Sequence, residues 1–146
     1  MSSKFNEVPD TRTLTLPTDS ATRKEYPLLS GVLKYFPAAL AGVSRISKTG
    51  NDKHNPGEPL HHARGKSMDH SDCIVRHLMD TEDLIAARKR GDPAATPDAI
   101  LLEAGQLAWR ALAYVQELHE RYGGAPLAPG ASATNGASGT QKPVDK

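Results

Sequence analysis

The sequence has few of the features that mark secreted or membrane proteins. Its one cysteine, Cys73, cannot form an internal disulfide, which excludes a disulfide-stabilised scaffold. No apolar run approaches the roughly 20 residues needed to span a bilayer, and the N-terminal stretch contains no signal-peptide core. We therefore expect a cytoplasmic protein without a membrane partner.

Aromatic residues and an excess of one charge are also scarce. Phe, Trp and Tyr make up 5% of the 146 residues, so a core must be mostly aliphatic. The 18 lysines and arginines nearly balance the 17 aspartates and glutamates, and the net charge of +1 excludes the strong field of a dedicated nucleic-acid binder. Any phosphate recognition must therefore be local, and no stable nucleic-acid complex is expected.

Composition divides the chain into three parts. Residues 1–22 are polar without a sustained period and predict a flexible N-terminal arm. Residues 124–146 are rich in Ala, Gly, Ser and Pro and predict a disordered tail. Residues 23–123 have the size of one domain, and strand signals are nearly absent from them. We predict an all-α fold, a small bundle of about four helices with a long loop.

Proline and glycine mark the ends of the predicted helices. Pro27 and Pro37 suit the first turns of two short helices, because proline lacks the amide that a helix interior needs. Thr96 as N-cap, Pro97 at the first position and Gly123 past the end delimit the last helix. Apolar residues cover most of that helix's circumference, so it is surrounded within a bundle or across a dimer, and we predict a homodimer.

The segment SKTGNDKHNPGEPLHHARGKS, residues 47–67, predicts a long loop. Its glycines and prolines break both helical and strand patterns, and long loops inside compact domains are often functional. The loop and its surroundings carry basic residues. These residues could bind a polyphosphate if the loop folds over it, or they could only increase solubility. These are Arg23, Lys24, Lys48, Lys53, Arg64, Lys66 and Arg76.

The next segment predicts an amphipathic helix from an N-cap at Ser67 to about Arg90, with Gly91 after its end. At about 100° per residue, one side collects polar residues and the opposite arc is apolar. The polar side is Asp69, Asp72, Arg76, Asp80 and Asp83; the apolar arc is Ile74, Val75, Leu78, Met79 and Ile85. Carboxylates one turn apart can share Mg²⁺, and a solvated helix face explains the same spacing.

Other chemical motifs are weak. His54, His61, His62, His70 and His77 lie in one quarter of the domain, but no pattern typical of zinc sites accompanies them. Cys73 has no base at a convincing spacing, which favours a buried thiol over a nucleophile. Walker, Rossmann and Gly-x-Ser-x-Gly motifs are absent.

Four stretches carry a resemblance to a known family: RKEYPLLSGVLKYFPAAL, SKTGNDKHNPGEPLHHARGKS, DHSDCIVRHL and LAWRALAYVQEL. Across residues 23–120 the chain resembles the phage and prophage dATP/dGTP diphosphohydrolase domain family. Its most specific matches are Lys-x-Gly-Asn joined to His-Asn-Pro-Gly, and the run of Asp72, Arg76 and His77. Through that family it is similar to the all-α MazG-type nucleotide pyrophosphohydrolases. The resemblance implies Mg²⁺-assisted hydrolysis of dATP or dGTP to the monophosphate and pyrophosphate in the cytoplasm of a phage-infected bacterium.

The resemblance also implies residue roles. Carboxylates holding Mg²⁺ would be Asp69, Asp72, Glu82, Asp83 and Glu103, of which Asp72, Glu82 and Asp83 would act in catalysis. Substrate would contact Lys48, Asn51, Lys53, His54, Asn55, Arg76 and His77. The chain departs from the MazG pattern where Glu103-x-x-Gln106 replaces a carboxylate with an amide. That departure leaves open an enzyme with a different ligand set, or a non-catalytic nucleotide-binding or phage accessory protein.

Overall fold

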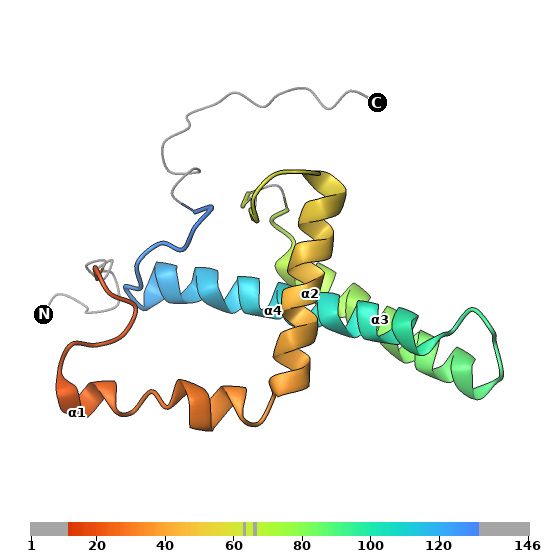
Figure 1. The fold of residues 1–146 in the computed structure, drawn as a ribbon, viewed down its shortest axis with the longest axis horizontal. Coiled ribbons are helices and arrows are strands. Elements are labelled where there is room, and N and C mark those ends of the chain that lie inside the picture. Colours follow the sequence, from red (N-terminus) through yellow and green to blue (C-terminus); the bar gives the residue numbers. More distant parts are fainter. Residues whose placement is uncertain (1–11, 63, 66, 132–146) are drawn as a thin grey trace, which may run out of the picture.

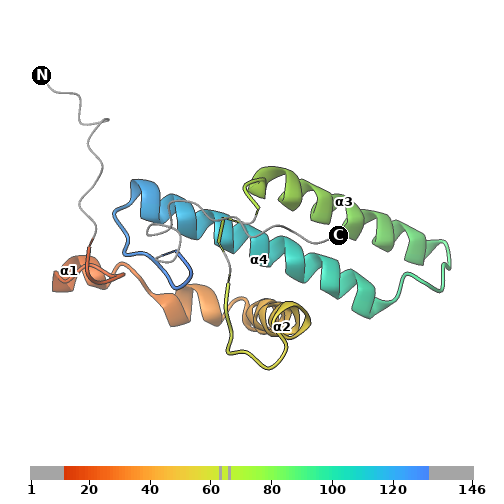
Figure 2. The same cartoon turned by 90° about the horizontal axis from the view of Figure 1, so that it is seen from above.

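The chain is built around an antiparallel pair of long helices (Figures 1 and 2). The computed structural model describes residues 12–62, 64–65 and 67–131, and this part contains helices and no strand. Helices α3 (His70–Lys89) and α4 (Pro97–Tyr122) form the pair, and α2 (Pro37–His54) crosses α4. A short α1 (Ser20–Arg23) and a π-helical segment η1 (Leu28–Leu33) precede them. The predicted all-α fold is confirmed.

Helix α4 begins and ends where its local signals predict. The Thr96 hydroxyl accepts a hydrogen bond from the Ala99 amide at 3.1 Å, and Pro97 occupies the first position. At the other end the Gly123 amide donates to the His119 carbonyl, and Gly124 adopts a left-handed φ of 66°.

Helix α2 extends into the predicted loop. It continues through Lys48 and Gly50 to His54, so the prediction of a loop from Ser47 was wrong. A glycine in a helix interior costs only about 1 kcal/mol, and an ion pair of 2.7 Å between Lys48 and Asp52 supports this turn. The helix ends before Pro56, because a residue that precedes proline is disfavoured in helical conformation.

The start of α3 also differs from its prediction. Asp69, and not Ser67, is the N-cap residue, and the Ser67 hydroxyl donates to the Asp69 carboxylate. The end of α3 is confirmed, since Gly91 follows it with a φ of 83°.

Helices α2 and α4 approach each other closely at Gly105. A Cβ atom added there would lie 2.7 Å from Cγ1 of Ile46, closer than side chains tolerate. Gly42 on α2 lies at the same crossing, where its carbonyl oxygen would be 3.9 Å from that Cβ, yet a Cβ on Gly42 itself would meet nothing within 4 Å. Only one of the two glycines is therefore required by packing.

This difference predicts opposite effects of alanine at the two positions. Gly42→Ala should raise the free energy of unfolding by roughly 0.5–1 kcal/mol, because alanine loses less backbone entropy in a helix. Gly105→Ala should lower it, because overpacking costs about 1–3 kcal/mol and exceeds the same entropic gain. Urea unfolding of both variants measures the difference, and an equal gain at the two positions would contradict the close crossing.

The chain beyond α4 folds back onto the bundle. Ala125 and Ala131 are buried, and the Gly124 carbonyl accepts a 2.9 Å hydrogen bond from the Arg12 amide. The packed chain thus continues to Ala131, past the predicted start of the tail at residue 124, and α1 begins inside the predicted N-terminal arm. The remainders of the predicted arm and tail, residues 1–11 and 132–146, lie outside the described residues.

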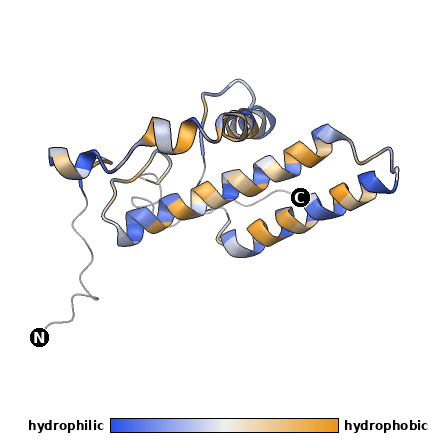
Figure 3. Ribbon diagram, turned by 90° about the horizontal axis from the view of Figure 1, so that it is seen from below, coloured by the Kyte–Doolittle hydropathy of each residue, from blue (hydrophilic) through white to orange (hydrophobic). Residues whose placement is uncertain are grey.

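Large apolar side chains remain exposed on η1, α3 and α4. Figure 3 shows hydrophobic residues along each of these three elements. In the described part of the chain, the buried apolar residues are Cys73, Ala95, Ala125 and Ala131, and no large side chain is fully buried. Helix α3 buries His70, Cys73 and Thr81, while Val75, Leu78 and Met79 of its apolar arc are 45–59% exposed. Within the described ranges, no helix has the combination of length and apolarity required to cross a bilayer.

Candidate functional site

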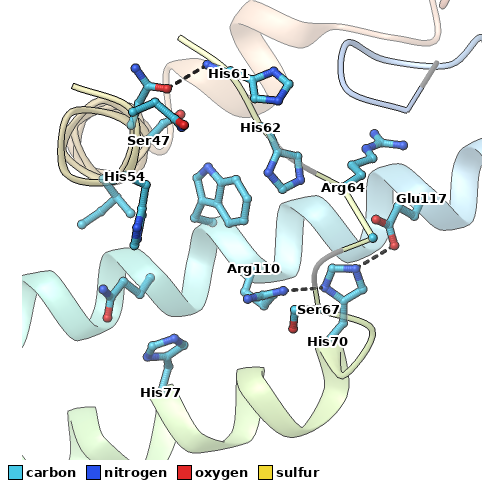
Figure 4. Close-up of a pocket in the computed structure, with 17 residues that line it drawn as sticks. Ser47, His54, His61, His62, Arg64, Ser67, His70, His77, Arg110 and Glu117 are labelled. Atoms are coloured by element: carbon cyan, nitrogen blue, oxygen red, sulfur yellow. Dashed lines mark hydrogen bonds and ion pairs between the residues drawn. The ribbon is translucent and has the colours of Figure 1, made fainter. Parts of the chain in front are cut away.

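A cavity of about 510 Å³ lies between the C-terminal half of α2, the connection to α3, and the facing sides of α3 and α4 (Figure 4). This volume is in the range of small-molecule sites. Its lining is rich in imidazole, guanidinium and amide groups and includes one carboxylate, that of Glu117. The polar lining residues are Ser47, Asn51, His54, Asn55, His61, His62, Arg64, Ser67, His70, His77, Gln106, Arg110 and Glu117.

Asn51 holds the connection between α2 and α3, which forms part of the cavity wall. Its side chain is buried at 5% exposure, donates to the Glu58 carbonyl at 3.1 Å and accepts from the His61 amide at 3.1 Å. Both polar ends of the amide are therefore engaged with the main chain. Asn51 positions the cavity wall in this structure.

A buried ion pair anchors the same connection to α4. Arg64 makes a two-pronged contact with Glu120, from Nη1 to Oε1 and from Nη2 to Oε2, the second at 2.8 Å. The side chains are 9% and 6% exposed. Hydrogen bonding from Arg64 lowers the pKa of Glu120 below its usual 4.5, so this carboxylate stays ionised.

A chain of three polar groups crosses one end of the cavity. The Nε2 atom of buried His70 lies 2.7 Å from Oε2 of Glu117, and Nη1 of Arg110 lies 3.4 Å from Nδ1 of His70. Figure 4 shows the imidazole between the other two groups. The His70 ring also stacks on Tyr114 at a centroid distance of 5.4 Å, which fixes its plane.

Trp109 supplies the aromatic surface of the cavity. His62 meets the Trp109 ring edge to face at a centroid distance of 4.5 Å. Burial, and then the charge of Arg64, lower the pKa of His62 below its usual 6.5, so its imidazole is neutral at pH 7. The cavity therefore combines a neutral aromatic wall with cationic groups.

A cluster able to hold a metal ion borders the cavity. His77, Asp80 and Glu103 each place one ligand atom within 4.8 Å of the others. His77 lines the cavity, and its Nδ1 atom lies 2.8 Å from Oε2 of Glu103. The cluster forms because α3 and α4 pack side by side, which brings residues 26 positions apart in sequence into contact.

The predicted carboxylates occupy different places. Glu103 belongs to the cluster, whereas Asp72, Glu82 and Asp83 are exposed on α3 and belong neither to the cluster nor to the cavity lining. Asp69 is exposed and pairs with Arg76 at 2.6 Å; hydrogen bonds from Arg76 and then Ser67 hold the pKa of Asp69 at about 2.

The predicted substrate-binding residues divide in the same way. Asn51, His54, Asn55 and His77 line the cavity. Lys48 and Lys53 are exposed on α2 and are not part of the lining, and neither is Arg76.

The sequence did not predict Trp109, Arg110 and Glu117 as site residues. It placed Asp80 among the carboxylates that can share a cation and His70 among the clustered histidines, but assigned neither a role in the site. Arg110 and Glu117 lie seven positions apart on the thin polar stripe of the otherwise apolar last helix. A polar stripe on a helix that is apolar elsewhere was the signal that could have identified them.

No family model matches the chain, and neither the curated proteins nor the solved structures include a match.

Proposed function

We propose that this cavity binds a purine deoxynucleoside triphosphate and that the protein hydrolyses it to the monophosphate and pyrophosphate. The observation that carries the proposal is the position of the His77, Asp80 and Glu103 cluster at the border of a cationic, ligand-sized cavity. Trp109 offers an aromatic face to a purine, and arginine and histidine side chains offer donors to phosphates. The resemblance to the dATP/dGTP diphosphohydrolase family supports the same reaction.

The chemistry of the cluster fits a divalent cation. One imidazole nitrogen with two carboxylates is a donor set typical of Mn²⁺ or Zn²⁺, whereas Mg²⁺ prefers oxygen ligands alone. A cation bound there would neutralise charge on phosphate oxygens and acidify a water molecule. Mg²⁺, implied by the resemblance, is therefore one of several cations to be tested.

The protein's own side chains position the substrate. In the proposed reaction a water oxygen attacks the α-phosphorus, the bond from this phosphorus to the bridging oxygen breaks, and pyrophosphate leaves with that oxygen. The two protons of the water pass to phosphate oxygens of the products or to solvent. Asn51 and Arg64 fix the connection between α2 and α3, whose residues form one wall of the cavity.

Pyrophosphate release tests this function. Each of the four deoxynucleoside triphosphates is incubated with the full chain and Mn²⁺, Mg²⁺, Zn²⁺ or EDTA. Release from dATP or dGTP that requires a cation supports the proposal. Nucleotide binding without release under any cation supports a non-catalytic nucleotide-binding protein, and neither binding nor release contradicts both.

We also propose that the protein is a homodimer whose interface covers the exposed apolar faces. Eleven side chains on η1, α3 and α4 are 44–67% exposed: Leu28, Leu29, Val32, Leu33, Val75, Leu78, Met79, Leu101, Leu102, Leu112 and Val115. Together they leave on the order of 1,000 Å² of surface open over the three elements, while a standard interface buries roughly 800 Å² per partner. A second copy fits because the same faces can pair about a two-fold axis, and a net charge of +1 opposes association little.

Charge on the exposed arc of α3 should disrupt this dimer. Light scattering after size exclusion is expected to give twice the 15.7 kDa chain mass for the wild type. Leu78→Lys combined with Met79→Lys should give the monomer mass, because it places two cations in an apolar interface. Leu14→Lys, at a side chain 53% exposed and outside these helices, is the control. A monomeric wild type at about 10 µM would contradict the proposal, since interfaces of this size commonly bind at micromolar or tighter affinity.

A further inference from the structure

The guanidinium of Arg110 has no ionic partner among the residues at 12–62, 64–65 and 67–131. Among the residues that the structure describes, no carboxylate oxygen lies within 4.0 Å of it, although Glu117 and His70 are close by. The side chain is half-buried and lines the cavity, so its charge is only partly solvated. A half-buried cation without a counter-ion, facing a ligand-sized cavity, is suited to an anion.

The orientation of Arg110 is set by its neighbours. Because Nη1 of Arg110 can only donate, Nδ1 of His70 must be the acceptor, and Nε2 of His70 therefore carries the proton donated to Glu117. The Glu117 carboxylate thus fixes the tautomer of His70, and His70 fixes one edge of the guanidinium. Four of the five N–H donors of Arg110 remain for a ligand.

A second arginine at this cavity also has an unused donor. Arg64 binds Glu120 through both terminal nitrogens, and its buried Nε atom has no hydrogen-bond partner in the described part of the chain. Buried N–H groups are rarely left unpaired, and an absent ion or ligand is one common reason. The lining of the cavity therefore contains a second arginine whose donors are not all paired, although it is Arg110 that keeps free donors beside the cavity.

We propose that Arg110, oriented by His70 and Glu117, binds a phosphoryl group of the ligand in this cavity. The inference rests on the proposed function for the identity of the ligand, but not for its turnover. Arg110 acts on the ligand directly, whereas His70 and Glu117 are positioning residues. The anion site lies on α4 one turn beyond Gln106, which also lines the cavity.

Binding without catalysis tests the proposal. Isothermal titration in EDTA measures the affinity of the full chain for pyrophosphate, dATP and deoxyadenosine. Arg110→Gln is expected to weaken pyrophosphate and dATP binding by about 10- to 100-fold, because charge-assisted hydrogen bonds are lost, and to leave deoxyadenosine binding unchanged. Arg45→Gln, an exposed arginine of α2 outside the cavity lining, is the matched control.

Two conservative variants separate positioning from structure. The amide of asparagine reaches the place of Nδ1 of histidine, and that of glutamine reaches the place of Nε2. His70→Asn can therefore still accept from Arg110 and should keep more pyrophosphate affinity than His70→Gln, which retains only the contact to Glu117. Equal losses in both variants, with intact helical circular dichroism, would contradict the positioning role.

Several results would overturn the proposal. These are unchanged pyrophosphate affinity in folded Arg110→Gln, an equal loss for deoxyadenosine, or no pyrophosphate binding by folded wild type at millimolar concentration. If Arg110→Gln does not fold, Arg110→Met, which also removes the charge but keeps the length of the side chain, replaces it, and unchanged affinity in that variant overturns the proposal equally. Loss of hydrolysis in a variant does not affect this test, because the titrations measure binding in EDTA and do not depend on turnover.

Discussion

Replacing Glu103 with glutamine is expected to reduce cation-dependent pyrophosphate release by at least about 100-fold. A catalytic cation is worth several kcal/mol, and each 1.4 kcal/mol changes a rate tenfold. Glutamine keeps the shape of the side chain and an oxygen that can accept the hydrogen bond from His77, so the fold should survive. It removes the negative charge that the cluster contributes to a cation. Two quantities are measured for each variant: the rate of pyrophosphate release and the affinity for Mn²⁺. Electron paramagnetic resonance of free Mn²⁺ gives the affinity.

The matched variants locate the metal site. Asp80→Asn should weaken Mn²⁺ binding and turnover in the same way, because Asp80 belongs to the same cluster. Asp98→Asn, at an exposed carboxylate in the first turn of α4, should change neither. Full activity in Glu103→Gln together with its loss in Asp72→Asn would move the site to the exposed stripe of α3 and contradict the cluster.

The ends of the helices were predictable where a few adjacent residues determine them. Thr96, Pro97 and Gly123 act within one turn of α4, and Gly91 acts within one turn of α3. The presence of Gly50 predicted a break in the helix, but α2 continues past Ser47 to His54. The free-energy cost of one glycine in a helix is smaller than the stabilisation from the contacts between α2 and α4. Local signals thus predicted these helix ends correctly. At the end of α2, tertiary packing outweighed the local signal.

The packed face of α3 is the clearest difference between pattern and structure. A helical wheel places Val75, Leu78 and Met79 on an apolar arc, but α3 turns His70 and Thr81 inward. The histidine face packs because α4 offers it Glu117 and Glu103 as partners. Such pairing depends on the register of two helices, and the sequence of either helix alone does not contain it.

The candidate site was predictable only in part for the same reason. The resemblance pointed to Glu103, His77, His54 and Asn55, which the fold places at or beside one cavity. The roles of Asp72, Glu82 and Asp83 stay predictions, since these side chains are exposed outside that cavity. The spacing of residues along one helix identifies carboxylates that share a face of that helix. It cannot identify the cluster, because His77 and Asp80 lie on α3 and Glu103 lies on α4.

The pair of Arg64 and Glu120 joins three segments of the fold. Besides Arg64 from the cavity wall, the Glu120 carboxylate accepts hydrogen bonds from Gln116 at 2.8 Å and from the Ala128 amide at 3.4 Å. Both charged side chains are more than nine-tenths buried. Removing one partner leaves a buried charge unpaired. This lowers the free energy of unfolding more than replacing both partners with apolar side chains.

Glu120→Leu and Arg64→Met are each expected to lower the free energy of unfolding by about 3–5 kcal/mol. The double variant should lose less than either single variant, because neither charge then remains buried and unpaired. Asp52→Asn, which breaks the exposed pair with Lys48, should cost at most about 0.5 kcal/mol and serves as the control. Urea unfolding measures the four variants and the wild type, and additive losses in the double variant would contradict a coupled buried pair.

The same pair predicts a pH dependence with a defined sign. Because Arg64 lowers the pKa of Glu120 in the folded protein below 4.5, the folded state holds fewer protons than the unfolded state in acid. The stabilisation is therefore complete above pH 4.5 and decreases as the pH falls through the lowered pKa of the folded state. Unfolding measured from pH 6 to pH 3 should show a smaller loss of stability in the double variant than in the wild type, because the double variant no longer contains this carboxylate. Equal slopes in the two proteins would mean that Glu120 contributes nothing to the acid sensitivity of the fold.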